Sequence, residues 1–339
     1  MRNRLCMISL FLIMLAACGG TPELTPGAQP PPTSPPDHPC GDGICQGPEN
    51  PINCPEDCPP VDGTSPPGPP EHPDAESGEY WITNPSSGVD LYVRLFVPAD
   101  WDGAGMPTLV LVPGGIGDSS DFTEARNDAE IIADAGFTVV VFDPDGRGNS
   151  GGEEDKNGHI HQDGLAAIIQ EIATYPEVDA QQIGLVSFSY GVTMASGALA
   201  RYPDLPVIFY IDWEGPANRE DTTFGCQPGR QGVGSIEFMS DCSDEAFWSE
   251  REGQTFIAQV RIPYQRLQSQ QDHAQQDHSH AIDMINAAIA GGVPWVRLND
   301  LPPNQTYDES SLPPMLPESL DRDLAPLVAE YATEMLSLR

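Results

Sequence analysis

Short runs of consecutive apolar, β-branched residues recur from about residue 78 onward, and this feature most limits how the chain can fold. Four such runs lie at 108–112, 138–142, 183–187 and 207–211. Runs of this length without polar alternation are typical of parallel strands whose two faces are both covered. Stretches with helical periodicity separate or follow them, at about 121–135, 162–174, 190–201, 279–290 and 321–337. The alternation predicts an α/β fold with a doubly wound, mostly parallel sheet.

Two segments before these runs alternate apolar and polar residues, at 80–83 and 89–97. Alternation with a period of two predicts strands with one exposed face, so we expect both at the edge of the sheet. A long Gly-rich and polar insertion, about 214–256, interrupts the alternation of strands and helices. We interpret the insertion as a lid; the alternative is a surface loop with no role in substrate entry.

The first 18 residues have the pattern of an export signal. Arg2 and Arg4 precede an apolar run that is too short to span a bilayer as a helix. The run ends in Leu15-Ala16-Ala17-Cys18, which resembles a bacterial lipobox, where the cysteine is acylated and becomes the mature N-terminus. Gly19 rather than an aspartate follows Cys18, which by resemblance to lipoprotein sorting permits transfer to the outer membrane. We therefore expect an exported protein with a lipid anchor.

Proline-rich segments and cysteines divide the region between the signal and the main domain. Residues 19–39 predict a tether, 40–58 a small Cys-rich module, 59–76 a second linker and 77–339 the α/β domain. The module holds Cys40, Cys45, Cys54 and Cys58. A piece this small needs disulfides to fold, and we expect two among these cysteines, with the connectivity left open.

The remaining cysteines and acidic residues add two expectations. Cys226 and Cys242 predict a third disulfide that staples the insertion, since Cys6 leaves with the signal. Asp42, Glu49 and Asp57 offer oxygen ligands that could bind Ca²⁺, or they merely cap turns.

The formal charge of −36, with Lys156 as the only lysine, disfavours nucleic acid and anionic membrane surfaces as partners. An acidic surface of this kind is mostly a device for solubility, and the alternative is a preference for cationic substrates. The sequence does not indicate an oligomeric state.

The strongest catalytic signal is the segment from Ile183 to Val192, in which Ser189 stands between Phe188 and Tyr190. A buried strand runs into a turn and then into a helix of small residues, which is the setting of a nucleophile elbow. The first glycine of Gly-x-Ser-x-Gly is replaced by Ser187, a mild departure because this position needs only a small residue. The pattern predicts Ser189 as the nucleophile.

On these residues, 78–339 resemble the α/β-hydrolase superfamily, nearest its dienelactone-hydrolase-like and acyl-peptidase-like members. The resemblance implies Ser–His–acid chemistry on an ester, thioester or amide carbonyl, without a metal or other cofactor. It also implies an oxyanion hole, built from the backbone N–H of Tyr190 and that of Gly115 or Ile116 in the glycine-rich loop after residue 112. The turn Asp143–Ser150 resembles a structural turn of the superfamily, in which Arg147 pins neighbouring loops.

The acid and base positions fit the resemblance less well. In the superfamily, a strand that begins Ile-Pro leads to the loop with the triad carboxylate, and after Ile262-Pro263 this position falls on Asp272. The superfamily's histidine follows the last strand, but here no histidine lies beyond His280. Without a base, the hydroxyl of Ser189 is a poor nucleophile.

Two explanations remain open. One is a base from the histidine-rich loop after the Ile262-Pro263 strand, with His273 favoured and His280 as the alternative; His278 completes this loop, and His159 or His161 comes next in line. Asp272, or the alternative acids Asp212 and Glu214, would then orient that base. The other explanation is a binding protein on the same fold that has lost hydrolysis. We favour a lipid-anchored serine hydrolase that acts on a carboxylic ester or a related acyl compound.

The lipobox generates a test that does not depend on catalysis. The Cys18→Ser variant should remain uncleaved or become soluble, because the thiol that carries the lipid is missing. Detergent phase partitioning and mass determination of the mature N-terminus measure both effects. A processed, detergent-phase Cys18→Ser protein would refute the lipobox interpretation.

Overall fold

The computed structural model describes residues 78–99, 101–223, 226, 240–273, 278–308, 310–311, 313–317 and 324–338. The signal segment, tether, Cys-rich module and second linker expected for residues 1–76 lie outside this part of the chain. So do the four module cysteines and the proposed Ca²⁺ ligands Asp42, Glu49 and Asp57.

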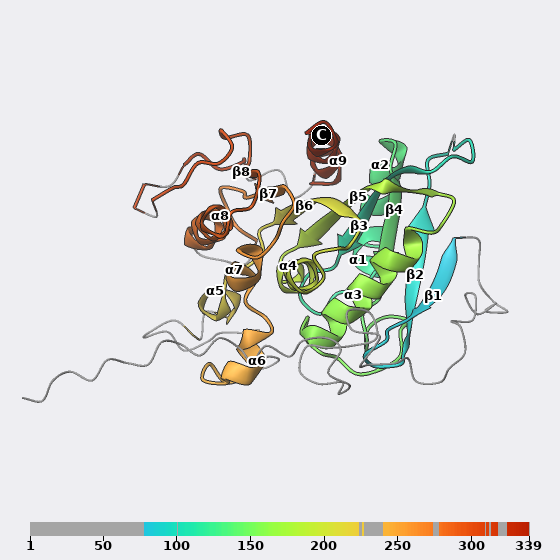
Figure 1. The fold of residues 1–339 in the computed structure, drawn as a ribbon, viewed down its shortest axis with the longest axis horizontal. Coiled ribbons are helices and arrows are strands. Elements are labelled where there is room, and N and C mark those ends of the chain that lie inside the picture. Colours follow the sequence, from blue (N-terminus) through green and yellow to red (C-terminus); the bar gives the residue numbers. More distant parts are fainter. Residues whose placement is uncertain are drawn as a thin grey trace, which may run out of the picture. The chain divides into compact units, whose positions relative to one another are not determined.

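The described strands form one sheet of eight strands in the order β1-β2-β4-β3-β5-β6-β7-β8 (Figure 1). Their bounds are β1 Glu79–Thr83, β2 Asp90–Phe96, β3 Met106–Val112, β4 Thr138–Phe142, β5 Val178–Phe188, β6 Val207–Trp213, β7 Tyr264–Leu267 and β8 Val296–Leu298. The first two strands pair antiparallel, β2 also pairs antiparallel with β4, and the pairs from β4 to β8 are parallel. The predicted mostly parallel α/β sheet with antiparallel strands at one edge is confirmed.

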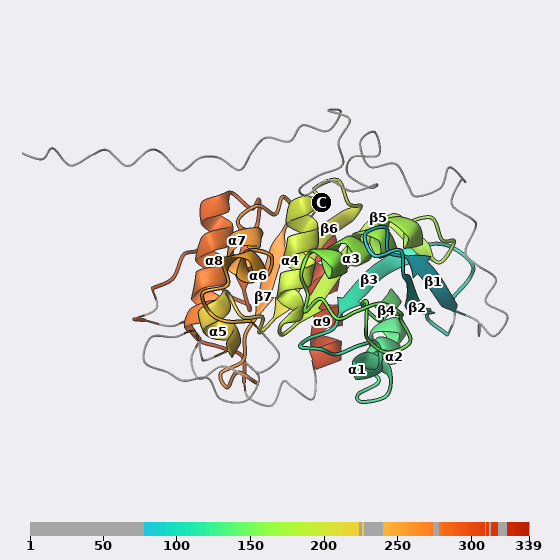
Figure 2. The ribbon, with the colours of Figure 1, turned by 90° about the horizontal axis from the view of Figure 1, so that it is seen from below.

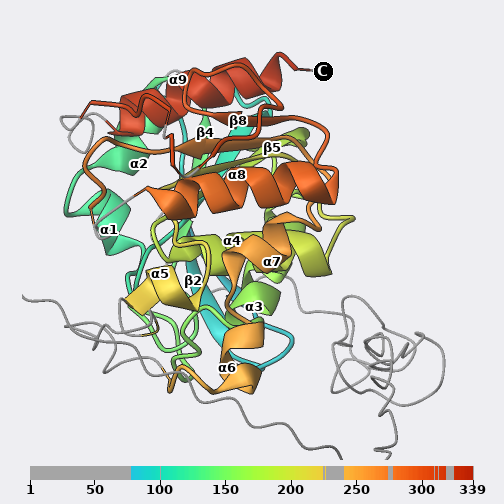
Figure 3. The ribbon, with the colours of Figure 1, turned by 90° about the vertical axis from the view of Figure 1, so that its left-hand side faces the viewer.

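Helices cover both faces of the sheet (Figures 2 and 3). Their bounds are α1 Ser120–Thr123, α2 Asp128–Asp134, α3 His159–Ile172, α4 Gly191–Arg201, α5 Arg219–Thr223, α6 Glu245–Ser249, α7 Gly253–Ile257, α8 Ser279–Gly291 and α9 Leu324–Leu336. Helices α3, α4, α7 and α8 pack into one hydrophobic core, and α1, α2 and α9 pack into the other.

Strand β3 shows why the central runs are continuously apolar. Val110 and Val112 point into one core, while Leu109 and Leu111 point into the other. All four side chains are fully buried, because successive side chains of a strand face opposite sides and here both sides carry helices.

Two details differ from the expectation. The helix expected at 121–135 is two helices, α1 and α2, separated by Asn127 with a φ of 56°. Asparagine tolerates this left-handed conformation, and a residue in that conformation ends a right-handed helix. The insertion at 214–256 contains α5, α6 and α7, of which α7 packs against α4 and α8 as part of a layer.

The expected disulfide between Cys226 and Cys242 is present. Between α6 and α7, Arg251 donates a hydrogen bond of 2.9 Å to Asp155, which fixes this end of the insertion on the body of the domain. The lid role of the insertion at about 214–256 remains a prediction, and its residues 224–239 apart from Cys226 lie outside the described part. Among the described helices, none is long and apolar enough to cross a membrane.

Candidate active site

Ser189 occupies the turn between the end of β5 and the start of α4. Its backbone φ is 51°, a left-handed conformation that costs energy for a residue other than glycine and is typical of strained functional turns. Close packing explains the small neighbours: a Cβ on Gly191 would lie 2.6 Å from the carbonyl oxygen of Pro113. At the other small position, the buried Ser187 hydroxyl lies 2.6 Å from the Tyr210 hydroxyl. The segment therefore has the geometry of a nucleophile elbow.

His273, in the loop after β7, reaches Ser189. Its Nε2 lies 2.7 Å from the Ser189 Oγ, within hydrogen-bond distance. The imidazole also stacks on the Trp213 ring, with centroids 4.6 Å apart and planes at 23°. Of the histidines that the sequence proposed, the structure brings His273 to the nucleophile.

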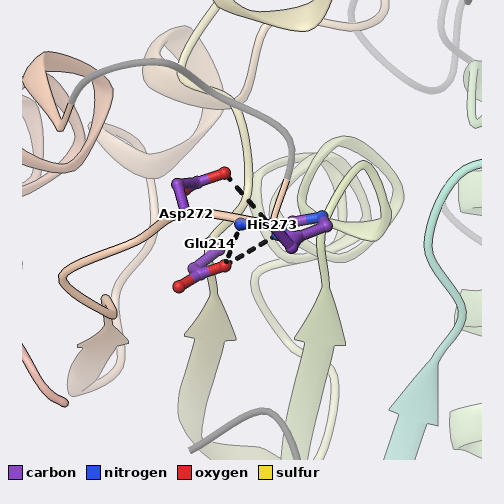
Figure 4. A group of neighbouring side chains, drawn as sticks. All are labelled: Glu214, Asp272 and His273. Carbon is purple, nitrogen blue, oxygen red and sulfur yellow. Dashed lines mark hydrogen bonds and ion pairs between the residues drawn. The ribbon is translucent and has the colours of Figure 1, made fainter. Parts of the chain in front are cut away.

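Glu214 is the carboxylate that holds His273 (Figure 4). Its Oε2 accepts hydrogen bonds from the His273 Nδ1 at 2.7 Å and from the His273 backbone N–H at 3.0 Å. Its Oε1 accepts a hydrogen bond of 2.9 Å from the backbone N–H of Ser269. Because Nδ1 donates to Glu214, Nε2 is left to accept the proton of Ser189, which is the tautomer that a general base needs.

The environment keeps Glu214 ionised. Burial by itself would raise the pKa of Glu214, and so would the charge of Asp272, but the hydrogen bonds from His273 and Ser269 outweigh both, and the pKa lies below its usual value. Glu214 also has a φ of 50°, so two members of this Ser–His–Glu group adopt left-handed backbone conformations. Such strain clusters at functional sites.

The other acids considered from the sequence have different partners. The Oδ1 of Asp272 lies 3.6 Å from the His273 Nδ1, beyond a hydrogen bond, so the expectation that Asp272 directly orients His273 is corrected in favour of Glu214. Asp212 forms a fully buried ion pair of 2.5 Å with Arg266 and does not serve as the alternative acid.

The alternative bases are also engaged elsewhere. His280 is fully buried, with Nε2 3.1 Å from Asp272. His161 is buried, its Nε2 lies 3.0 Å from the carbonyl oxygen of Asp145, and burial with the nearby Arg147 lowers its pKa to about 3. His159 lies near Glu250, with 3.6 Å between the Nδ1 and a carboxylate oxygen.

The glycine-rich loop after β3 lies against the elbow, as expected of an oxyanion loop. A Cβ on Gly114 would lie 2.7 Å from the Phe188 carbonyl oxygen and 3.0 Å from the Ser189 Cβ, so this position requires glycine. The Gly117 N–H donates to the Gly114 carbonyl, which closes a turn around Gly115 and Ile116. Among the backbone hydrogen bonds of the described turns and loops, none uses the N–H of Tyr190, Gly115 or Ile116. These donors remain candidates for holding an oxyanion.

Arg147 ties this loop to the elbow. Its Nη1 donates to the Gly117 carbonyl at 3.1 Å, and its Nη2 donates to the Asn157 side chain at 2.8 Å. The amide of Asn157 in turn donates to the Tyr190 carbonyl at 2.9 Å. Arg147 therefore pins neighbouring loops, as the sequence indicated, and the loops are those around the nucleophile.

At the end of β8, where the superfamily places its histidine, Asn299 holds the loop after β7. Its Oδ1 accepts a hydrogen bond of 2.8 Å from the Gln268 N–H, and its Nδ2 donates one of 3.0 Å to the Gln268 carbonyl. The sequence did not identify Asn299 or Trp213 as part of the site, and it did not place Glu214 ahead of Asp272 as the acid. The available signal was Asp212-Trp213-Glu214-Gly215, in which two carboxylates follow the apolar run 207–211 at the end of β6.

A cavity of about 310 Å³ adjoins Ser189 and His273. Phe122, Phe188 and Trp213 provide aromatic walls, and Asp121 and Arg126 contribute charged groups. Beside the cavity, one ligand atom each of Glu214, Asp272 and His273 lie within 4.8 Å of one another, a spacing that could suit a metal ion. Because the His273 Nδ1 already donates to Glu214, we assign the group to proton transfer.

Comparison with known proteins agrees with this architecture. Residues 87–213 match the family model of the X-Pro dipeptidyl-peptidases (S15 family). The match covers less than half of the chain and includes Ser189 but ends one residue before Glu214. An uncharacterized protein of Pseudomonas aeruginosa is 28% identical over 115 residues, which are 33% of this chain and 30% of that protein.

Solved structures of hydrolases share the fold. Est1E from Butyrivibrio proteoclasticus, solved with ferulic acid, gives a TM-score of 0.55 at 14% identity, over 76% of this chain and 99% of its own. Acetyl xylan esterase 1 from Thermoanaerobacterium gives 0.52 at 13% identity, over 77% and 85%. Dipeptidyl peptidase 4 of Porphyromonas gingivalis gives 0.54 at 18% identity, over 76% of this chain but 35% of its own. The expected α/β-hydrolase superfamily fold is confirmed.

The two hydrogen bonds between the Asn299 side chain and the Gln268 backbone, here called the Asn299 clamp, generate a prediction about how firmly His273 is positioned. Asn299 has a φ of 48°, which glycine adopts readily, so Asn299→Gly removes both bridging hydrogen bonds without adding backbone strain. We expect kcat to fall by roughly 10-fold to 100-fold, because small displacements of a catalytic group are costly.

Asn304→Gly is the matched control. Asn304 also has a positive φ of 59°, and its side chain accepts a hydrogen bond from the Val296 N–H on the side of β8 away from the clamp. Steady-state kinetics on a small ester compare the two variants. Equal turnover in both would contradict a role of Asn299 in holding His273.

Proposed function

We propose that this α/β-hydrolase is a lipid-anchored serine hydrolase that cleaves a carboxylic ester or a related acyl compound. The observation that carries the proposal is the continuous hydrogen-bonded chain from Ser189 through His273 to Glu214, with 2.7 Å at each step. A non-catalytic binding protein would need neither a positioned base nor a strained carboxylate behind it. The chain of hydrogen bonds therefore favours an enzyme over the binding-protein alternative.

In the first half of the reaction, the Ser189 Oγ attacks the substrate carbonyl carbon while its proton passes to the His273 Nε2. The carbonyl oxygen becomes an oxyanion, which the N–H groups of Tyr190 and of Gly115 or Ile116 would hold. Glu214 stabilises the imidazolium that forms. When the tetrahedral intermediate collapses, His273 returns the proton to the leaving oxygen, and an alcohol departs from an acyl ester on Ser189.

In the second half, a water molecule gives a proton to the His273 Nε2 and attacks the acyl carbon. The new intermediate collapses, the bond to the Ser189 Oγ breaks, and His273 returns the proton to the serine. The acid product leaves, and the site is restored. Its residues suffice for both steps by the general logic of serine hydrolases.

The cavity supports an acyl or alcohol group of moderate size. Its volume of about 310 Å³ lies at the lower end of the range for small-molecule sites, and Phe122, Phe188 and Trp213 line it with aromatic surface. An ester substrate is supported by the esterase structures, whose chains are matched over 99% and 85% of their length.

Export and anchoring belong to the proposal as well. Cys18 in its lipobox setting supports a lipid anchor, and the outer membrane is the expected location. The Cys226–Cys242 disulfide supports an oxidising compartment.

A peptidase that recognises a free amino group is the second candidate. The S15 match over 87–213 favours it, and so does Asp121, which lines the cavity. Among the residues that the structure describes, none donates a hydrogen bond to this carboxylate. Burial and the neighbouring Asp118 raise the pKa of Asp121 more than Arg126 and Arg147 lower it. A substrate ammonium would supply the missing partner.

The triad makes a prediction about the histidines. His273→Ala should lower kcat by at least about 10³, Ser189→Ala should be equally severe, and the double variant should be no worse, because the residues act as a unit. Hydrolysis of a p-nitrophenyl ester and labelling by a fluorophosphonate probe measure the effect.

His278→Ala is the control from the same loop and should retain wild-type turnover. If His273→Ala keeps its turnover while Ser189→Ala is inactive, the base lies elsewhere. If the wild-type protein neither turns over esters nor labels, the binding-protein alternative is correct.

Asp121 separates the two candidate functions. If the site takes amino-terminal substrates, Asp121→Asn should raise KM by about 10-fold for an aminoacyl ester with a free ammonium group, the cost of one charged hydrogen bond. A neutral ester of similar size should be unaffected within a few-fold. Equal changes for both substrates would argue against ammonium recognition.

A further inference from the structure

A second carboxylate lies beside the imidazole of His273. The Asp272 Oδ1 is 3.6 Å from the His273 Nδ1, while the Glu214 Oε2 is 2.7 Å from the same atom. Both carboxylates are fully buried, and they lie on the same side of the imidazole (Figure 4). Nδ1 has one proton to donate, and Glu214 receives it.

The far side of Asp272 is held in place. Its Oδ2 accepts a hydrogen bond of 2.8 Å from the Gln268 Nε2, and the His280 Nε2 lies 3.1 Å from the same oxygen. Two donors on one oxygen orient the carboxylate, with Oδ1 towards His273.

The donor character of His280 follows from Arg266. The Arg266 Nη2 lies 3.1 Å from the His280 Nδ1, and a guanidinium can only donate, so Nδ1 accepts. With Nδ1 as an acceptor, the ring proton lies on Nε2, which donates to Asp272. The Gly215 carbonyl also lies 3.1 Å from Nδ1, but it accepts the shorter hydrogen bond, of 2.7 Å, from the Arg266 Nη1, so we assign Nδ1 as the acceptor from Nη2. A directed series of donors thus runs from Arg266 through His280 to Asp272.

This series begins at a rigid point of the fold. Arg266 on β7 and Asp212 on β6 form a fully buried ion pair on neighbouring strands. The Arg266 Nη2 also donates to the Gln268 side chain at 2.8 Å, and Gln268 is the second donor to Asp272. The carboxylate beside His273 is therefore fixed by two routes from the same guanidinium.

We propose that Asp272 is a positioning residue that acts on His273 as a second anion: it helps to stabilise the imidazolium in the transition state and takes over from Glu214 when that carboxylate is removed. The inference rests on the proposed serine hydrolase function and goes beyond its Ser–His–Glu triad. The distance from Asp272 to Nδ1 exceeds that of Glu214 by about 1 Å, and at 3.6 Å in a buried site the charge of Asp272 acts on the imidazolium without a direct hydrogen bond.

The test compares wild type, Glu214→Gln, Asp272→Asn and the double variant. Asp272→Asn alone should lower kcat by about 10-fold with KM within twofold, because Glu214 still orients His273. In the Glu214→Gln background the same change should lower kcat by at least about 100-fold further, to the level of His273→Ala, because no carboxylate then faces Nδ1. A merely structural role would give the same factor in both backgrounds.

A variant that keeps the carboxylate at position 272 should restore activity instead of removing it. Glu214→Gln/Asp272→Glu keeps a carboxylate and extends it towards Nδ1, so it should be more active than Glu214→Gln/Asp272→Asn. Glu214→Gln/Asp272→Glu should also be at least as active as Glu214→Gln alone, and this second comparison uses no asparagine variant, so it holds if those variants fold poorly. All kcat values are normalised to folded protein by circular dichroism.

Asp163→Asn is the matched control, since it makes the same change at another buried carboxylate. Asp163 binds Arg201 and Tyr202, each at 2.5 Å, on the α3–α4 face, and its variant should retain wild-type kcat per folded molecule. Equal factors for Asp272→Asn in both backgrounds, or Glu214→Gln as inactive as His273→Ala, would overturn the inference while leaving the hydrolase in place. Absence of turnover and labelling in wild type would instead overturn the proposed function, and the inference with it.

Discussion

The hydrogen bond between the buried Glu214 carboxylate and the His273 Nδ1 is the interaction on which the rest of the site depends. It sets the tautomer that lets Nε2 face Ser189, and it provides the negative charge that an imidazolium needs. Placing Glu214 there requires a left-handed backbone and hydrogen bonds from the N–H groups of Ser269 and His273. The fold therefore accepts local strain and a buried charge at the point where the chemistry gains most from a fixed geometry.

The arrangement leaves Ser189 at the expected elbow after β5 but moves the acid and the base of the proposed triad by one strand each from the superfamily pattern implied by the sequence. The acid follows β6 instead of β7, and the base follows β7 instead of β8. The loop after β8 has become a support, because Asn299 clamps the backbone of Gln268 on both its N–H and its carbonyl. Triads depend on the mutual geometry of three side chains and not on their order, so the exchange preserves the chemistry.

Two buried arginines organise the loops around the nucleophile and the base. Arg147 links Gly117 of the oxyanion loop, through Asn157, to the carbonyl of Tyr190. Arg266 links the strand ends under the base to His280 and Gln268. A guanidinium offers five donors in a rigid fork, so one side chain can hold several backbone and side-chain acceptors in fixed relation. The loops that carry the candidate site residues are not helices or strands, and the hydrogen bonds from the two arginines hold them in place.

The sequence by itself determined the sheet, the elbow and much of the base. Apolar runs such as 108–112 predict buried parallel strands because their pattern is local, and the elbow around Ser189 is predicted for the same reason. The sequence also pointed to His273, because the loop after the Ile262-Pro263 strand and the elbow both follow carboxyl ends of parallel strands, which meet at one edge of the sheet. Only the tertiary structure decided among Asp212, Glu214 and Asp272. Asp212 lies in β6 and pairs with Arg266, while Glu214 and Asp272 follow β6 and β7, and a difference of about 1 Å in their reach to His273 selects Glu214. Such differences arise from contacts between distant segments, which no local pattern in the chain encodes.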